Sequence, residues 1–279
     1  MRTVVVLAAL FPSLVFAGAC KKSAGELKTI DVAADAMGDP SHPATVRIHV
    51  DHADLHLTPG GAHLVGGAVR SNVSDLDPRV DAAADHATVT QGDPASEVSW
   101  SVDYVADWRL TLGPTPMALV VENGSGTTDL DLGGLAVRSL RVRAGAGTIH
   151  AGWSSPGTLT ADALDLETGA GTIEAVNVGR LGASKIRVHS GAGTIKLDFG
   201  DKVERDVSVD LESGAGAITV MVPSSVTARA TAEHGIGAVS AKGWTADGDA
   251  FLLGPAGAPP RVTVRAKAAV GAVSFVAGP

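Results

Sequence analysis

Three closely spaced histidines are the first candidates for chemistry in this chain. His49, His52 and His56 fall within eight residues, and the neutral imidazole of histidine is a common ligand of zinc and copper. On an extended strand, residues 49 and 52 point to opposite faces, so the three rings could converge on one ion only if the chain bends at His52. Solvated surface histidines are the simpler interpretation, and the sequence predicts no bound metal.

Other patterns that could carry catalysis or ligand binding are incomplete. A Gly-x-Gly unit recurs along the chain, but no copy extends to G-x-G-x-x-G or to Gly-Lys-Ser/Thr, as a phosphate-binding loop requires. No G-x-S-x-G elbow surrounds a serine. Asp247 and Asp249 flank Gly248, yet two carboxylates supply too few oxygen ligands for calcium. The sequence therefore predicts no catalytic residue and no cofactor.

Composition narrows the class of protein. The 279 residues include 34 glycines, few aromatic residues and a formal net charge of −8. This balance lacks the basic patch that neutralises phosphates in a nucleic-acid binder. Abundant valine, threonine and glycine favour short strands joined by tight turns over helices.

The N-terminus is typical of an exported protein. Arg2 precedes an apolar run from Val4 to Phe16, which is too short to span a bilayer as a permanent helix. Small residues then lead to Cys20, the single cysteine, in a segment that resembles a bacterial lipoprotein cleavage box. We predict a signal peptide over residues 1–19 and a lipidated Cys20 that anchors the chain to the membrane; ordinary cleavage before a free Cys20 is the alternative. Lys21 resembles the residue found in lipoproteins sent to the outer membrane.

The rest of the chain divides into a tether and one domain. Residues 20–45 show no sustained period and are predicted to be a flexible tether that begins at the lipidated cysteine. Alternation of apolar and polar residues begins at Val46 and indicates strands. We expect a single domain over residues 46–279, with an irregular part over 46–107 and repeats over 108–279.

The repeats carry most of the information about the fold. Their first glycines are 21 to 24 residues apart, and a degenerate copy, Ala269 to Val273, follows an insertion. Periods of this length are typical of solenoids. We predict that the glycines lie at structural turns, since glycine reaches positive φ without a clash. These turn glycines are Gly124, Gly126, Gly145, Gly147, Gly169, Gly171, Gly191, Gly193, Gly214, Gly216, Gly235 and Gly237.

The spacing of aliphatic residues around each glycine pair predicts how the repeats stack. Leu166 and Ile173 are seven residues apart, as are Val188 and Ile195. An odd step cannot keep both residues on one face of a straight strand, so the chain must bend at the glycines. Strand, glycine corner and strand make a rung of about 22 residues, and stacked rungs make an all-β, parallel and right-handed β-helix. Barrels and sandwiches are the alternative, but they would show two-residue hairpin turns.

The stretch from Trp108 to Trp244 resembles the toast-rack, or putative adhesin, family of bacterial β-helix domains. A segment around Leu55 to Gly67 is similar to the N-terminal part of the same family. The segments that carry the resemblance in the repeats are Gly124 to Gly126, Asp129 to Leu135, Leu140 to Val142, Gly145 to Ile149, Gly214 to Pro223 and Gly235 to Gly237. The resemblance implies a secreted protein or the extracytoplasmic part of an envelope-stress system. It brings no catalytic residues to transfer, and likeness of fold is not function.

The residue two positions before each first glycine should point outward. Stacked one rung apart, these residues would form an exposed ladder of mixed charge, whose simplest role is to solvate the surface. The ladder is Glu122, Arg143, Glu167, His189, Glu212, Glu233 and Lys267. The residues just after the inward aliphatics repeat no single residue type, which argues against a calcium-binding roll; they are His150, Glu174, Lys196, Thr219 and Ser240.

These observations favour a non-catalytic envelope lipoprotein that presents a rigid β surface to an unknown envelope protein or glycan. A polysaccharide-active β-helix enzyme is one alternative, which would require clustered acids and aromatic platforms for sugars. A structural spacer is another.

Overall fold

The computed structural model describes residues 25–92, 104–255 and 261–279. Within these ranges, two short 3-10 turns, Ser74–Leu76 and Val178–Leu181, are the only helical elements, and the strands form one continuous sheet of sixteen strands. The predicted all-β class is confirmed. The predicted signal peptide and Cys20 lie outside the described residues.

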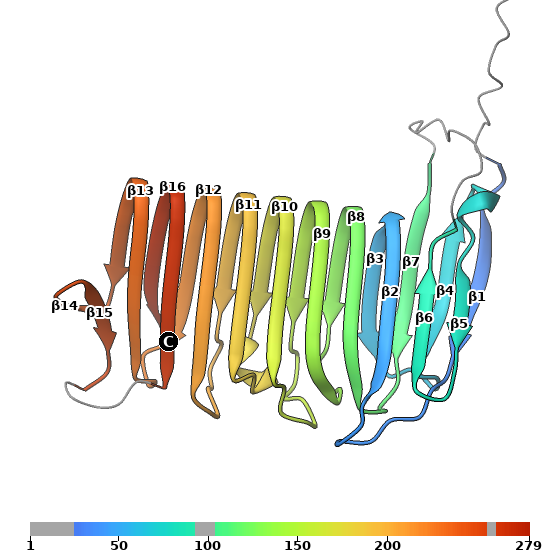
Figure 1. The fold of residues 1–279 in the computed structure, drawn as a ribbon, viewed down its shortest axis with the longest axis horizontal. Coiled ribbons are helices and arrows are strands. Elements are labelled where there is room, and N and C mark those ends of the chain that lie inside the picture. Colours follow the sequence, from blue (N-terminus) through green and yellow to red (C-terminus); the bar gives the residue numbers. More distant parts are fainter. Residues whose placement is uncertain (1–24, 93–103, 256–260) are drawn as a thin grey trace, which may run out of the picture.

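Seven long bent strands stand side by side and build most of the molecule (Figure 1). Each one runs up one layer, bends at its glycine corner and returns along the other layer. Paired residues on successive rungs, such as Leu140, Leu164, Ile186 and Val209, are 24, 22 and 23 positions apart. All the pairings between these strands are parallel. The strands are β8 (Met117–Asp131), β9 (Val137–Gly152), β10 (Ala163–Val176), β11 (Lys185–Asp198), β12 (Val207–Pro223), β13 (Ala228–Lys242) and β16 (Val262–Gly278).

A thin aliphatic core lies between the two arms of each bent strand. On β11, Val188 before the corner and Ile195 after it are both buried, although seven residues separate them. The bend therefore restores the inward face on the second arm. Burying an aliphatic side chain of this size stabilises the fold by about 2 kcal/mol, and no rung alone could enclose its own aliphatic residues.

The first rung is made of two strands, β2 (Ala44–His52) and β3 (Asp54–Pro59), which pair with the two arms of β8. Beyond it, each layer continues separately. On one side lie β6 (His86–Thr90) and β5 (Arg79–Ala82); on the other lie β7 (Ala106–Leu112), β4 (Val65–Ser71) and β1 (Lys28–Ala34).

The prediction of a flexible tether over residues 20–45 is wrong for the segment that forms β1. This strand pairs antiparallel with β4 along its whole length, and Val32 and Ala34 are buried. Ile30, Val32 and Ala34 alternate with polar or small residues, but the run is too short to stand out from its surroundings.

The last strand of the chain does not occupy the last place in the stack. β16 lies between β12 and β13, and it pairs with both in parallel (Figure 1). The order of repeats along the chain predicts that the degenerate copy, Ala269 to Val273, stacks after the copy that begins at Gly235. This prediction is wrong, because β16 lies one place earlier. The insertion that precedes β16 contains β14 (Thr245–Asp247) and β15 (Ala250–Leu253), which extend the sheet beyond β13 and leave the slot beside β12 for the C-terminus.

Close contact between stacked corners explains why both glycines of a pair are needed. The second glycine, as at Gly193, has a positive φ of 138°. The first does not, but a Cβ added at Gly191 would stand 2.5 Å from the carbonyl oxygen of Gly169 on the preceding rung. Conformational freedom, which the sequence suggested for every turn glycine, therefore explains only the second of each pair. The first rung turns through Asp51, His52 and Ala53 without glycine.

Replacing Gly193 with alanine should lower the free energy of unfolding by about 3 kcal/mol or more, because a Cβ there meets backbone as well as an unfavourable φ. Gly248→Ala is the matched control: its φ is also positive, at 58°, but nothing lies within 4 Å of the added atom, so only about 1 kcal/mol should be lost. Denaturant titration measures both. Equal losses would contradict a contact between corners.

Candidate functional site

Side chains of alternating charge cross the outer face of the first arms. From rung to rung acidic and basic residues alternate, and His49 of β2 adds a member before Glu122. The insertion of β16 completes the alternation, because Lys267 lies between Glu212 and Glu233 instead of after them. We call this set row one. In spatial order it is His49, Glu122, Arg143, Glu167, His189, Glu212, Lys267 and Glu233.

Ion pairs within row one link neighbouring rungs. The Nδ1 atom of His49 is 3.2 Å from a carboxylate oxygen of Glu122, and Arg143 Nε donates to Glu167 at 3.1 Å. His189 Nδ1 lies 3.8 Å from a carboxylate oxygen of Glu212. Most of these side chains are about half exposed, so each pair contributes well under 1 kcal/mol to stability. Their common effect is to fix where each charge stands.

A second row lies two residues earlier on each first arm, and sequence analysis missed it. Arg141 pairs with Asp165 at 3.3 Å, and Arg265 lies 3.9 Å from Asp210. The missed signal was the same alternation of charge: Arg141, Asp165, Arg187 and Asp210 alternate in chain order, and β16 beside β12 adds Arg265. Row two comprises Arg141, Asp165, Arg187, Asp210 and Arg265.

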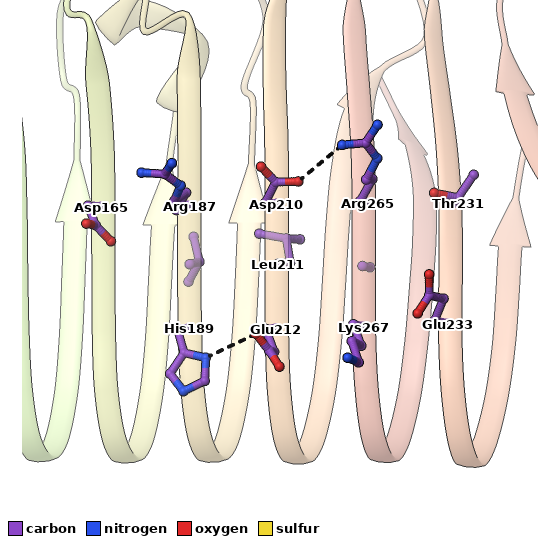
Figure 2. A pocket seen from close by; sticks show the side chains of 12 residues that line it. Asp165, Arg187, His189, Asp210, Leu211, Glu212, Thr231, Glu233, Arg265 and Lys267 are labelled. Carbon is purple, nitrogen blue, oxygen red and sulfur yellow. Dashed lines mark ion pairs between the residues drawn. The ribbon is translucent and has the colours of Figure 1, made fainter.

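A shallow depression of about 450 Å³ lies where rows one and two cross β11, β12, β16 and β13. Figure 2 shows Arg187 and Arg265 above, with His189 and Lys267 below, and carboxylates between them. The lining of the depression thus presents basic and acidic groups side by side.

The second arms carry a shorter row of alternating charge. His56 Nδ1 is 3.2 Å from Asp129, His150 Nδ1 is 3.5 Å from Glu174, and Lys196 approaches the same glutamate at 4.0 Å. The row then continues through uncharged Thr219, Ser274 and Ser240. These residues repeat no type, as the sequence indicated, but they alternate in sign.

The three candidate metal ligands do not meet. His49 points to Glu122 on the first arm, and His56 points to Asp129 on the second. His52 lies at the corner between them, with Nδ1 2.5 Å from Ser125 Oγ. No group of three histidine, cysteine or acidic side chains with metal-binding geometry occurs in the parts of the chain that the structure describes. Asp247, considered for calcium, pairs with Arg229 at 3.3 Å.

The corner at His52 is held by two side chains from outside the rung. Gln91 Oε1 accepts from the backbone N–H of Asp51 at 2.7 Å, and the Tyr104 hydroxyl donates to the carbonyl oxygen of His52 at 2.8 Å. Burial raises the pKa of Tyr104 because it disfavours the phenolate, so this hydroxyl remains a donor well above neutral pH. A second depression of about 400 Å³ opens beside it.

The charged surface can bind a partner, but it has few means to catalyse a reaction. A general acid needs a carboxyl group shielded from water, whereas the side chains of Asp210 and Glu212 are 42% and 57% exposed. The chemistry on offer is ion pairing and hydrogen bonding from side chains held at the spacing of parallel strands, about 4.8 Å.

A family comparison agrees with this architecture. Residues 22–154 match the model of the N-terminal domain of toast-rack, DUF2154. This part of the chain belongs to the toast-rack family. The matched residues include β1, the first rung, β8 and β9, so the family segment covers the start of the stack together with the strands that extend it.

Two solved structures that align with most of this chain have low sequence identity to it. A "putative cell adhesion protein" from Clostridium sporogenes is 15% identical, and the match covers 91% of this chain and 100% of that one with a TM-score of 0.48. A "putative adhesin" from Parabacteroides distasonis is 11% identical, with 90% and 98% covered and a TM-score of 0.45. A search of curated proteins gives no match.

A search for membrane-spanning helices over the described residues also finds none that is long and apolar enough.

Reversing the charge of Lys267 tests the order of the stack. Lys267→Glu should lower the free energy of unfolding by about 1 kcal/mol, because three glutamates would then stand on adjacent rungs. Lys267→Met, which removes the charge alone, should cost less. Thermal unfolding at low and high salt separates the two, since salt screens repulsion between exposed charges. If the stability lost by Lys267→Glu were the same at low and high salt, the electrostatic explanation would be contradicted.

Proposed function

We propose that this protein is an exported, lipid-anchored component of the bacterial envelope that binds a protein or glycan partner through its outer charged face, without catalysis. The observation that carries the proposal is the pair of alternating-charge rows around the depression on β11, β12, β16 and β13. Charges in fixed alternation favour a partner with the complementary pattern and disfavour others, since like charges brought together cost several kcal/mol.

Rigidity supports a binding role. Both arms of each inner rung are hydrogen-bonded to neighbours on two sides, and the glycine positions of the corners leave no room for a Cβ. A surface that is already ordered loses little conformational entropy on binding. We further propose that the coil is right-handed, because nearly all crossovers between parallel strands of one sheet have that hand.

The alternatives each make a different demand. A polysaccharide-active enzyme needs aromatic platforms for sugar rings, but Trp108 and Trp153 are buried and Trp244 packs against Phe275 at a centroid distance of 5.7 Å. A structural spacer needs no particular order of surface charge, whereas row one alternates over eight positions. Activity screens on envelope polysaccharides with calcium would show the first, and deletion of the protein without an envelope phenotype would favour the second.

The membrane anchor can be tested at a single residue. We predict that Cys20→Ser moves the protein from the membrane to the soluble fraction and abolishes incorporation of a labelled fatty acid, since a multiply acylated cysteine is the only anchor the sequence suggests. Lys21→Ser, next to it, should keep the label. Membrane association of Cys20→Ser that equals wild type would refute the anchor.

The binding surface can be tested by cross-linking in intact cells. A photo-reactive residue placed at Arg187 should capture a partner, and the capture should fall when Asp210→Asn and Arg265→Gln are added, because the lining of the depression then loses its alternation. The matched control neutralises Lys202 and Glu204, an exposed pair 2.9 Å apart outside the depression. A partner captured equally by all variants would place the binding surface elsewhere.

A further inference from the structure

The stack ends at β13 with an edge that is only half covered. Residues Ala228 to Thr231 of β13 pair with β15, but residues 232–242 pair with β16 alone among the described strands (Figure 1). The uncovered part includes the glycine corner and the whole second arm. A free strand edge of this length presents unpaired N–H and C=O groups, which favour pairing with another strand.

The two most exposed large apolar side chains of the bent strands lie at the corners of β13 and of its neighbour β16. Ile236, between the two glycines of the corner, is 73% exposed, and its neighbour on β16, Val270, is 49% exposed. Inner rungs have alanine there: Ala146, Ala170, Ala192 and Ala215. Val239 is only partly buried, whereas its counterparts Ile195, Ile218 and Val273 are fully buried. On the last rung, β13, apolar side chains thus lack the neighbouring rung that buries their counterparts in the inner rungs.

The other end of the molecule is built differently. There the first rung is extended on one layer by β6 and β5 and on the other by β7, β4 and β1, which include antiparallel pairs. It offers no bent parallel edge on which β13 of another molecule could continue the stack. Head-to-tail growth into a filament is therefore disfavoured, and a closed pair of like ends is the remaining symmetric arrangement.

We propose that the free edge of β13 pairs with the same edge of a second copy of this chain, giving a two-fold dimer joined at its C-terminal ends. In this dimer the two-fold axis passes through the corner of β13 and runs midway between its two arms. The first arm of one β13 then lies against the second arm of the other, and the two strands are antiparallel. Because the corner involves an odd step, inward residues then meet inward residues across the axis. Val239 of each copy is enclosed, and Ile236 of each lies near the axis.

The charges at this edge are self-complementary under that symmetry. Glu233 stands near the start of the free segment and Lys242 at its end, and both are exposed on the outer face. Antiparallel pairing puts Glu233 of one copy beside or diagonally opposite Lys242 of the second copy, twice per dimer. The alternation of row one would thus continue across the junction.

This proposal can be tested with charge-reversal variants, measured singly and as a mixture, in the protein purified as the cell processes it. Light scattering over a dilution series gives the mass of the particle, corrected for any bound detergent. Wild type should change from dimer to monomer on dilution. Glu233→Lys and Lys242→Glu should each raise the dissociation constant by about tenfold, since each creates two repulsive contacts. An equimolar mixture of the two variants should recover the dimer, because both contacts between unlike chains are attractive.

The matched controls act away from the edge. Lys202→Glu reverses an exposed charge outside β13 and should leave the dissociation constant unchanged. Ile236→Ser should weaken the dimer, whereas Val176→Ser, at a side chain 37% exposed on β10, should not. A wild type that is monomeric at every concentration overturns the proposal, and so does a mixture that stays as weak as its two components. A dimer indifferent to both reversals also overturns it. These results would leave the proposed binding role of the charged face intact, since that face is tested separately.

Discussion

The backbone approach between stacked corners is the constraint on which the structure depends. At the glycine corners of β9, β10, β11 and β12, the carbonyl oxygen of one rung occupies the space where the next would carry a Cβ. Glycine is required there because of the neighbouring rung as well as the bend. The first rung, with Asp51, His52 and Ala53, has the same shape but no rung before it, and it needs no glycine. These tight corners bring the two arms of each bent strand close together, so that single aliphatic side chains fill the space between them.

Local regularity made much of this fold predictable. The repeating interval and the seven-residue step across each corner predict parallel rungs and their inward residues, since both follow from strand geometry. The place of β16 could not be read from spacing, because stacking order depends on contacts between residues far apart in sequence. A charge argument was nevertheless available. In chain order Glu212 and Glu233 would be neighbours, and placing Lys267 between them removes that repulsion. β1 was missed because its short alternation includes small and polar residues.

The candidate site was predicted only in outline. Six members of row one and the degenerate Lys267 follow from the register of the glycines. The place of Lys267 in row one, the last member of row two and the depression depend on the inserted strand. The histidines show the opposite case. Their proximity in sequence suggested convergence, yet the corner at His52 sends His49 and His56 to different layers, where each meets its own carboxylate. Residues close in sequence can thus be separated by one bend, while residues dozens of positions apart are brought together by stacking.

The insertion of β16 also governs when the molecule can be completed. The strand that fills the place between β12 and β13 comes after β13 in the chain, so a nascent chain can build the rungs up to β12 but must leave β13 without its neighbour until β16 has been made. Until then, β13 lacks the strand that joins it to the rest of the stack.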